Sequence, residues 1–285
     1  MTIPKEAGMT RHDLRLGVAL VAALALLLPG SALLAQSGKV EVLWLGQAAF
    51  TITSPGGKVI VLDPFLVNNP KTPAEYKNLD KLGKVDLILI THGHGDHVGD
   101  VKELAAKTNA KVYGPAGLIA TLVDLGWVSA EQGVRFGKGG KVQPLGPSIT
   151  VTQVRAEHSS EVTITDPATK KSTTHPGGEP AGFIVEMENG FKVYHMGDTG
   201  LFGDMKLIAD YYKPDLILMP IGGHFVMDPQ DAAHATREWL KPKFVIPMHY
   251  GTFPVLKGMP QEYMAALGQT TTKVFPINPG DKLAF

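Results

Sequence analysis

The chain of 285 residues contains no cysteine. This absence excludes disulfide bonds, thiolate metal ligands, a cysteine nucleophile and a lipid-modified N-terminal cysteine. Charge of one sign is also not in excess, because Lys plus Arg and Asp plus Glu number 27 each. Proteins that bind nucleic acid usually carry a basic excess or a basic stripe. We therefore expect a small-molecule substrate and no nucleic-acid partner.

Long hydrophobic runs are absent except near the N-terminus, where Leu16–Leu28 forms an apolar run of 13 residues after Arg11 and Arg15. A membrane-spanning helix needs about 20 apolar residues. A basic start, a short apolar run and small residues before a cleavage point are typical of a secretory signal. The pattern predicts cleavage after Ala35, no stable membrane anchor and a periplasmic or secreted protein. An uncleaved anchor is the alternative.

Internal repeats and low-complexity linkers are absent beyond this segment, so residues 36–285 are predicted to form a single domain. Short β-type runs alternate there with helical stretches, which indicates a layered α/β or α+β protein. The expected strands are 40–45, 49–53, 58–62, 86–90, 149–155, 181–186, 191–195, 216–219 and 244–247. The expected helices are 101–108 and 229–240, the second with Asp228 as its N-cap. The polar stretch 160–178 is expected to be a surface loop.

The most informative stretch is Thr91–His97, with the sequence THGHGDH. Imidazole and carboxylate are ligands that zinc, iron and manganese sites share. In an extended chain, residues two apart point the same way, so His92 and His94 can bind one metal together. A turn at the intervening glycines would bring Asp96 and His97 toward a second metal. The stretch therefore predicts a metal site with two ions.

Further ligands are offered at the ends of predicted strands, by His158, Asp198 and His249. A histidine alone is more often an ordinary hydrogen-bonded group than a ligand. The order of these residues after the first cluster, and their placement at strand ends, favours metal binding.

The order His-x-His-x-Asp-His, then a single His, Asp and His, resembles the signature of the metallo-β-lactamase superfamily. Within it, the chain is similar to small bacterial metal-dependent hydrolases near ascorbate-6-phosphate lactonase and the phospholipase D that cleaves N-acyl ethanolamine lipids. The segments that carry this closer resemblance are Trp44–Gly46, Leu62–Phe65, His158–Ser160, Gly178–Phe183, His195–Gly200, Ile221–Gly223 and Pro247–Gly251. The resemblance covers roughly residues 39–285. It implies a four-layer αββα sandwich, in which two mixed sheets pack face to face with helices outside.

Carried over position by position, the resemblance implies one ligand set for each metal and one shared carboxylate. The first set is His92, His94 and His158, the second set is Asp96, His97 and His249, and the bridging carboxylate is Asp198. Two divalent metal ions are implied, with Zn²⁺ expected and Mn²⁺ or Fe as alternatives. Such a pair lowers the pKa of a shared water and supplies hydroxide for attack on a carbonyl or phosphoryl centre.

Other residues beside these motifs are candidates for supporting roles. Asp96 and Asp198 are expected to orient the nucleophile as well as to bind metal. Asp63 is either a carboxylate that fixes a ligand imidazole or a turn-forming residue before a proline. His224 and Tyr250 are the candidates for protonating the leaving group. The aromatic residues that could line a pocket, or simply belong to the core, are Phe65, Phe225 and Phe253.

Hydrolysis of a small ester, lactone or phosphodiester is the leading interpretation. β-Lactam hydrolysis is disfavoured because that branch often uses a cysteine at the second metal. Iron redox chemistry is disfavoured because flavodiiron-type relatives usually carry an acidic residue where His94 stands. A non-catalytic metal-dependent binding protein would usually have lost ligands, and none is missing here. RNA processing conflicts with the zero net charge, and a homo-oligomer is compatible with the sequence.

Overall fold

The computed structural model describes residues 38–285 together with Thr2. The predicted export signal over residues 1–35, apart from Thr2, lies outside the described residues. Within the described part of the chain, two seven-stranded sheets are accompanied by one two-stranded sheet. No helix of that part is long and apolar enough to cross a membrane.

The first sheet has the strand order β16-β1-β2-β3-β4-β5-β6. Strands β16, β1, β2 and β3 pair antiparallel, whereas β3 to β6 pair parallel. The bounds of the strands are β1 (Glu41–Gly46), β2 (Ala49–Thr53), β3 (Val59–Leu62), β4 (Leu87–Leu89), β5 (Lys111–Pro115), β6 (Gly133–Phe136) and β16 (Lys282–Ala284).

The second sheet has the strand order β15-β14-β13-β12-β11-β8-β7. Strands β12 to β15 pair parallel, and β11 pairs antiparallel with both β8 and β12. The bounds of the strands are β7 (Lys141–Val142), β8 (Thr150–Arg155), β11 (Ala181–Glu186), β12 (Lys192–His195), β13 (Leu216–Pro220), β14 (Phe244–Met248) and β15 (Lys273–Val274).

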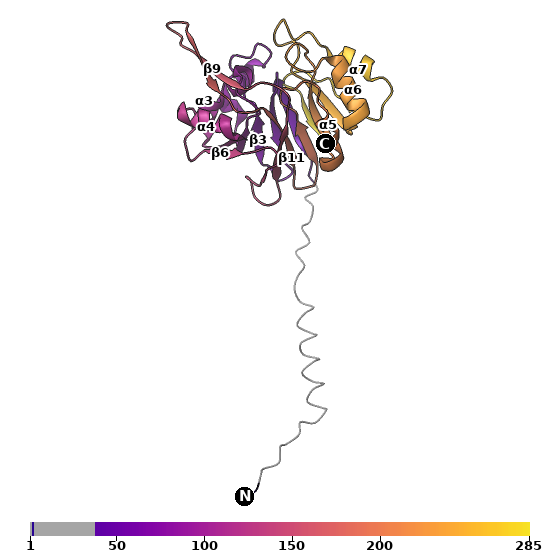
Figure 1. Ribbon diagram of the computed structural model, residues 1–285, viewed down its shortest axis with the longest axis horizontal. Helices are drawn as coiled ribbons and strands as arrows, with labels where there is room; N and C mark the ends of the chain where they lie inside the picture. Colours follow the sequence, from indigo (N-terminus) through magenta and orange to yellow (C-terminus); the bar gives the residue numbers. More distant parts are fainter. Residues whose placement is uncertain (1, 3–37) are drawn as a thin grey trace. The chain divides into compact units, whose positions relative to one another are not determined.

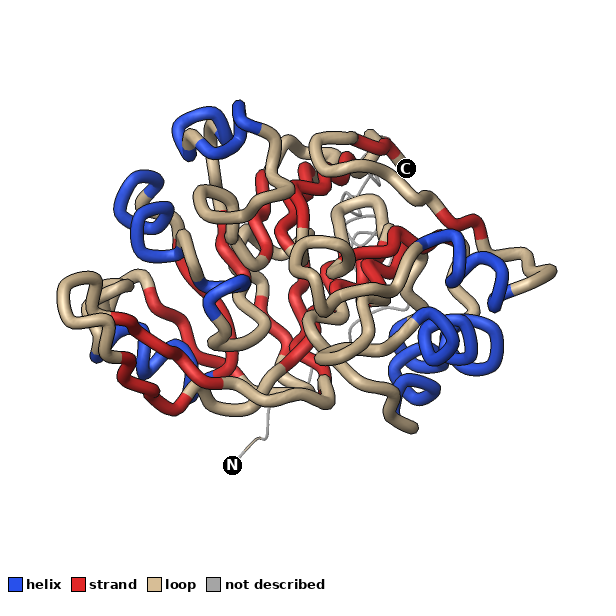
Figure 2. The backbone as a smooth tube through the Cα atoms, turned by 90° about the horizontal axis from the view of Figure 1, so that it is seen from above, coloured by secondary structure: helices blue, strands red, loops and turns tan. Residues whose placement is uncertain are grey.

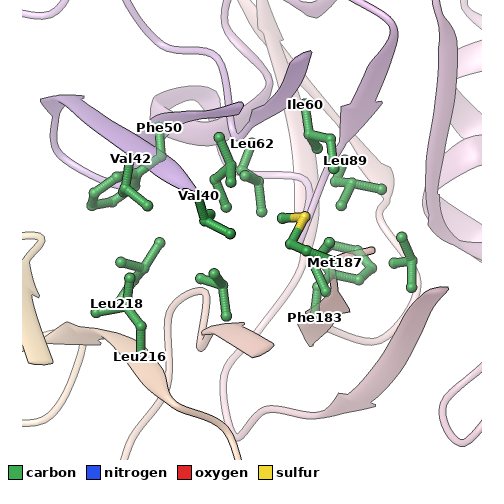
Figure 3. Packing of buried hydrophobic residues seen from close by; sticks show 14 of the residues in the cluster. Val40, Val42, Phe50, Ile60, Leu62, Leu89, Phe183, Met187, Leu216 and Leu218 are labelled. Atoms are coloured by element: carbon green, nitrogen blue, oxygen red, sulfur yellow. The ribbon is translucent and has the colours of Figure 1, made fainter. Parts of the chain in front are cut away.

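The two large sheets bury an apolar core between them (Figure 3). Val42 and Phe50 of the first sheet and Phe183 and Leu218 of the second belong to this core, and all four are fully buried. Side chains alternate between the faces of a strand, so the intervening residues point outward. Each sheet is therefore apolar on both faces, and its outer face needs a covering layer.

Helices provide that covering layer on each outer face (Figures 1 and 2). On the first sheet these are α3 (Val101–Thr108) and α4 (Ala116–Asp124). On the second sheet they are α5 (Asp204–Tyr212), α6 (Pro229–His234), the π-helix η3 (Ala235–Leu240) and α7 (Pro260–Leu267). The carboxylate of Asp228 accepts hydrogen bonds from Gln230 N and Asp231 N and is the N-cap of α6, as predicted. This arrangement confirms the αββα sandwich.

The prediction of a surface loop over residues 160–178 was wrong. Most of this stretch forms a hairpin of β9 (Glu161–Thr165) and β10 (Ser172–Pro176), which projects from the domain (Figure 1). Its threonines favour extended backbone. Val162 of β9 is fully buried and belongs to the apolar cluster on the outer face of the first sheet. The polar composition concealed the strands because their remaining residues mostly face solvent.

The carboxyl ends of several strands point to one edge of each sheet. Strands β8, β12 and β14 run in the same direction, because β11 is antiparallel to both β8 and β12. In the first sheet β1 and β3 share a direction because β2 is antiparallel to both, and β4 shares it because it pairs parallel with β3. Every predicted ligand lies in a segment that follows one of these ends, which determines where a site can form.

Candidate metal centre

The structure brings all seven predicted ligands together in two groups, within each of which the donor atoms lie within 4.8 Å of one another. The segment after β4 and the short helix α2 (Gly95–Val98) supply four of them, and the segments after β8, β12 and β14 supply one each. The first group is His92, His94 and His158, and the second is Asp96, His97, Asp198 and His249.

In the first group, ring nitrogens of the three histidines converge. The Nδ1 atom of His94 lies 3.0 Å from His92 Nε2 and 3.3 Å from His158 Nε2. Burial lowers the pKa of His92 and of His158, so both imidazoles are neutral near pH 7. A neutral imidazole has a free lone pair, which is the form that binds a metal.

The second group joins the imidazoles of His97 and His249 to the carboxylates of Asp96 and Asp198. The Oδ2 atom of Asp96 lies 3.8 Å from His97 Nε2 and 3.5 Å from His249 Nε2. Burial raises the pKa of Asp96, but the nearby His97 and His249 outweigh this effect and lower it below its ordinary value. The carboxylate is therefore ionised and available to a cation.

The carboxylate of Asp198 lies between the two groups. Its Oδ2 atom is 2.9 Å from His249 Nε2 and 3.6 Å from His158 Nε2. Its Oδ1 atom is 3.3 Å from His97 Nε2. Burial opposes ionisation of Asp198, yet His249 and His97 hold its pKa well below the usual range. Burial also lowers the pKa of His249, but Asp198 reverses this and raises it to about 9.

The donor atoms fit a divalent cation. His97 Nε2 and Asp198 Oδ1 are buried and have no hydrogen-bond partner among the described residues. Leaving buried polar atoms unpaired is costly, and a bound cation would satisfy both. The donors are imidazole nitrogens and carboxylate oxygens only, a set that Zn²⁺, Mn²⁺ and Fe accept.

A buried carboxylate next to the second group fixes one of its imidazoles. Asp63 Oδ2 accepts hydrogen bonds from His97 Nδ1 at 2.8 Å and from Thr91 Oγ1 at 2.7 Å. Its Oδ1 atom accepts a hydrogen bond from Thr91 N at 2.8 Å. Because Nδ1 of His97 donates to Asp63, Nε2 is the ring nitrogen that faces the second group, where a cation would replace its proton. Asp63 thus has the contacts expected of a carboxylate that orients a ligand.

Replacing Asp63 with asparagine should weaken metal binding about 10- to 100-fold. The amide oxygen of the asparagine can still accept a hydrogen bond from Thr91 N. The amide nitrogen then takes the place of Oδ2, and it cannot accept a hydrogen bond from His97 Nδ1. The imidazole would then favour the other tautomer, which removes the lone pair from Nε2. Competition with a chromophoric chelator measures this loss. The exposed Asp80, which pairs with Lys107, provides the control variant Asp80→Asn, and wild-type affinity in Asp63→Asn would refute this role.

Two polar residues of the site were not predicted from the sequence. His94 Nε2 donates to Glu161 Oε2 at 2.9 Å, and this hydrogen bond lowers the pKa of Glu161. Gln47 Nε2 donates to Asp96 Oδ2 at 2.8 Å and lies 2.7 Å from His249 Nε2. Glu161 lies in the stretch expected to be a loop. Gln47 directly follows β1. Its position after a strand end, like that of the ligands, could therefore have identified it from the sequence.

The structure does not bring the two candidate proton donors to the cluster. His224 is exposed and lines a separate cavity of about 540 Å³. The hydroxyl of Tyr250 lies 3.5 Å from the carbonyl oxygen of Ile277, its ring packs 5.4 Å from that of Trp44, and burial raises its pKa to about 12. The geometry therefore supports a proton-donor role for neither residue. His195 is a core residue, whose Nε2 donates to Ala48 O at 2.9 Å.

A cavity of about 580 Å³ opens over the metal-binding groups. Its lining combines donor residues from both groups with apolar residues. All three predicted phenylalanines are among the apolar ones. The lining residues are Phe65, His94, Gly95, Asp96, His158, Asp198, Phe225, His249, Phe253 and Leu256. Its size is that of a pocket for a small organic molecule.

The fold and this cluster define the class of protein. Residues 53–250 match the family model described as the beta-lactamase superfamily domain. In a search of solved structures, the chain is similar to Igni18, a metallo hydrolase from the archaeon Ignicoccus hospitalis. The TM-score is 0.73 and the identity 34%, over 87% of this chain and 98% of that one. The protein is a metal-dependent hydrolase of the metallo-β-lactamase superfamily.

Curated relatives narrow this class to one family. The chain is 60% identical over 249 residues to a UPF0173 metal-dependent hydrolase of Polaromonas sp., covering 87% of this chain and 91% of the relative. It is 45% identical over 248 residues to a UPF0173 metal-dependent hydrolase of Rubrobacter xylanophilus, covering 86% and 97%. The chain belongs to the UPF0173 family of metal-dependent hydrolases.

Proposed function

We propose that the protein hydrolyses a small ester, lactone or phosphodiester with two divalent metal ions, most simply Zn²⁺. The observation that carries this proposal is the position of Asp198. Its Oδ2 atom lies 2.9 Å from a histidine of the second group, His249, and 3.6 Å from one of the first, His158. A carboxylate in this position can bind one cation with each group and hold the two close together.

The two groups would hold a pair of divalent cations, which would supply activation of water as a nucleophile at neutral pH. The residues of the chain provide the charge and order that this chemistry needs. Asp96 and Asp198 remain ionised, so they offset the cationic charge and can accept a hydrogen bond from an attacking water. Asp63 accepts a hydrogen bond from Nδ1 of His97, and Glu161 accepts one from Nε2 of His94. These hydrogen bonds fix the orientation of the two imidazoles.

The test is a panel of lactones, carboxylic esters, phosphodiesters and β-lactams, assayed with protein loaded separately with Zn²⁺, Mn²⁺ and Fe²⁺. We expect hydrolysis of at least one of the first three classes at a rate that follows metal content. Preferential hydrolysis of a β-lactam would assign the protein to that reaction instead. Fully loaded protein that hydrolyses nothing in the panel would support a non-catalytic binding protein.

We also propose that the chain is exported and cleaved after Ala35, because Leu16–Leu28 is a short apolar run after basic residues. Mature protein from the natural host should then begin at Gln36 and be found in the periplasm or the medium. Intact-mass measurement of protein from that host checks the N-terminus. Retention of residues 1–35 in membrane-associated protein would contradict cleavage and support an anchor.

A further inference from the structure

The cavity over the metal-binding groups is lined by apolar side chains as well as by donor residues, and we call this apolar part of the lining the wall. Four of the ten lining residues form this wall, namely Phe65, Phe225, Phe253 and Leu256. The rings of Phe65 and Phe253 lie 6.3 Å apart, so they form one continuous surface. A molecule that fills this cavity would therefore meet aromatic carbon as well as the donor residues.

Two of the four wall residues, Phe65 and Leu256, are buried, whereas Phe225 and Phe253 are not packed into the interior of the domain. The three phenylalanines belong to none of the three buried apolar clusters that hold the layers together. Phe225 is 58% exposed and Phe253 is 36% exposed. Exposed apolar area is unfavourable in water at about 25 cal/mol per Å², and contiguous apolar patches commonly mark binding sites. The exposure of these rings is therefore better explained by a ligand than by the fold.

Two exposed valines lie close to wall residues in the sequence. Val67 follows Phe65 by two residues, Val255 follows Phe253 by two residues, and both are exposed. Among the described residues that line the cavity there is no lysine and no arginine. Apart from the donor histidines, nothing in the lining could pair with a carboxylate or phosphate on the part of a substrate that lies along the wall.

We propose that the substrate is an uncharged carboxylic ester or lactone that carries an apolar acyl or alkyl substituent, which packs on the wall of Phe65, Phe225 and Phe253. This inference rests on the proposed hydrolase function and narrows it. The carbonyl group lies over the metal-binding groups, and the substituent extends toward the surface past Phe253. Water adds to the carbonyl carbon, the bond to the alkoxy oxygen breaks, and the products are a carboxylate with a proton and an alcohol.

The first experiment compares p-nitrophenyl acetate with p-nitrophenyl octanoate, and an unsubstituted lactone with its alkyl-substituted counterpart. Burial of a methylene group is worth a factor of about four, so kcat/KM should be at least about a hundredfold higher for each substrate with the apolar chain. A carboxylate-terminated ester of the same length should be a poor substrate. Equal rates for short and long chains, or preference for a phosphodiester or for the carboxylate-terminated ester, would overturn the inference.

The second experiment changes the wall. In Phe225→Ala and Phe253→Ala the ratio of kcat/KM for octanoate over acetate should fall about tenfold, with metal content unchanged. Leu207 is the matched control, because it is exposed and apolar but lines a different cavity, on α5. Leu207→Ala should leave the ratio as in the wild type. A ratio that is unchanged in both phenylalanine variants would overturn the assignment of the wall.

A binding measurement separates this inference from the proposed function. Calorimetric titration with octanamide and acetamide, on metal-free protein, needs no turnover. Octanamide should bind more tightly, with a negative heat-capacity change typical of apolar burial, and Phe225→Ala should weaken it. Metal-loaded protein that hydrolyses no ester, lactone or phosphodiester but still binds octanamide would refute the proposed function while supporting the apolar site. Hydrolysis without selective octanamide binding would refute the site alone.

Discussion

Replacing Asp198 with alanine should lower turnover about a thousandfold or more, whichever ester, lactone or phosphodiester proves to be the substrate. The carboxylate contacts His158 of the first group and His97 and His249 of the second. In the proposed two-metal site, its removal would take away the carboxylate shared by the two cations. Loss of about 4 kcal/mol of transition-state stabilisation is enough for a thousandfold change in rate.

The fold should survive this substitution. Asp198 is buried, but its partners are the donor histidines rather than any of the three apolar clusters. Turnover and metal content should be measured on the same preparation, with circular dichroism to verify folding. Asp204, an exposed carboxylate paired with Arg155, gives the control Asp204→Ala, which should retain activity. Wild-type turnover in Asp198→Ala would show that this residue does not bridge the metals.

Removal of the metals should abolish hydrolysis and lower the midpoint of thermal unfolding by about 10 °C. A ligand present at about a thousand times its dissociation constant stabilises the native state by about 4 kcal/mol. In a domain of this size each kcal/mol shifts the midpoint by about 2–4 °C. The apolar clusters remain intact without metal, so the metal-free protein should still unfold cooperatively.

Dialysis against a chelator, followed by calorimetry and assay, checks this expectation. Addition of Zn²⁺ or Mn²⁺ should restore both activity and the unfolding midpoint, whereas Mg²⁺ should restore little, because imidazole is a poor ligand for it. His234, which lies on α6 and is in neither group, provides the control His234→Ala with normal metal dependence. Full activity of protein shown to be free of metal would refute a metal-dependent reaction.

Local patterns in the sequence predicted a layered α/β or α+β protein and a metal site, and the resemblance to the superfamily implied the sandwich and the full ligand set. Buried strands such as β4 and β14 are short apolar runs, and each is followed directly by a ligand segment. His92, His94, Asp96 and His97 lie in one short segment made of a loop and the start of α2. Their proximity in sequence therefore ensures their proximity in space. The predicted strands match the observed ones to within about two residues at either end.

Contacts between distant segments left no such pattern. Glu161 reaches His94 only because residues 161–176 form a hairpin. Tyr250 is not among the residues that line the cavity, for a related reason. It directly follows His249, whose φ of 56° turns the backbone, and successive side chains point to different sides. Adjacency to a ligand in sequence therefore did not bring it to the site.

We expect the chain to bind two metal ions with the two groups that share Asp198. Native mass spectrometry of protein purified without chelators, combined with elemental analysis, measures this most directly. We predict two divalent ions per chain in the wild type and fewer in Asp198→Ala. One ion or none in the wild type, or two ions in both proteins, would contradict the shared two-metal site.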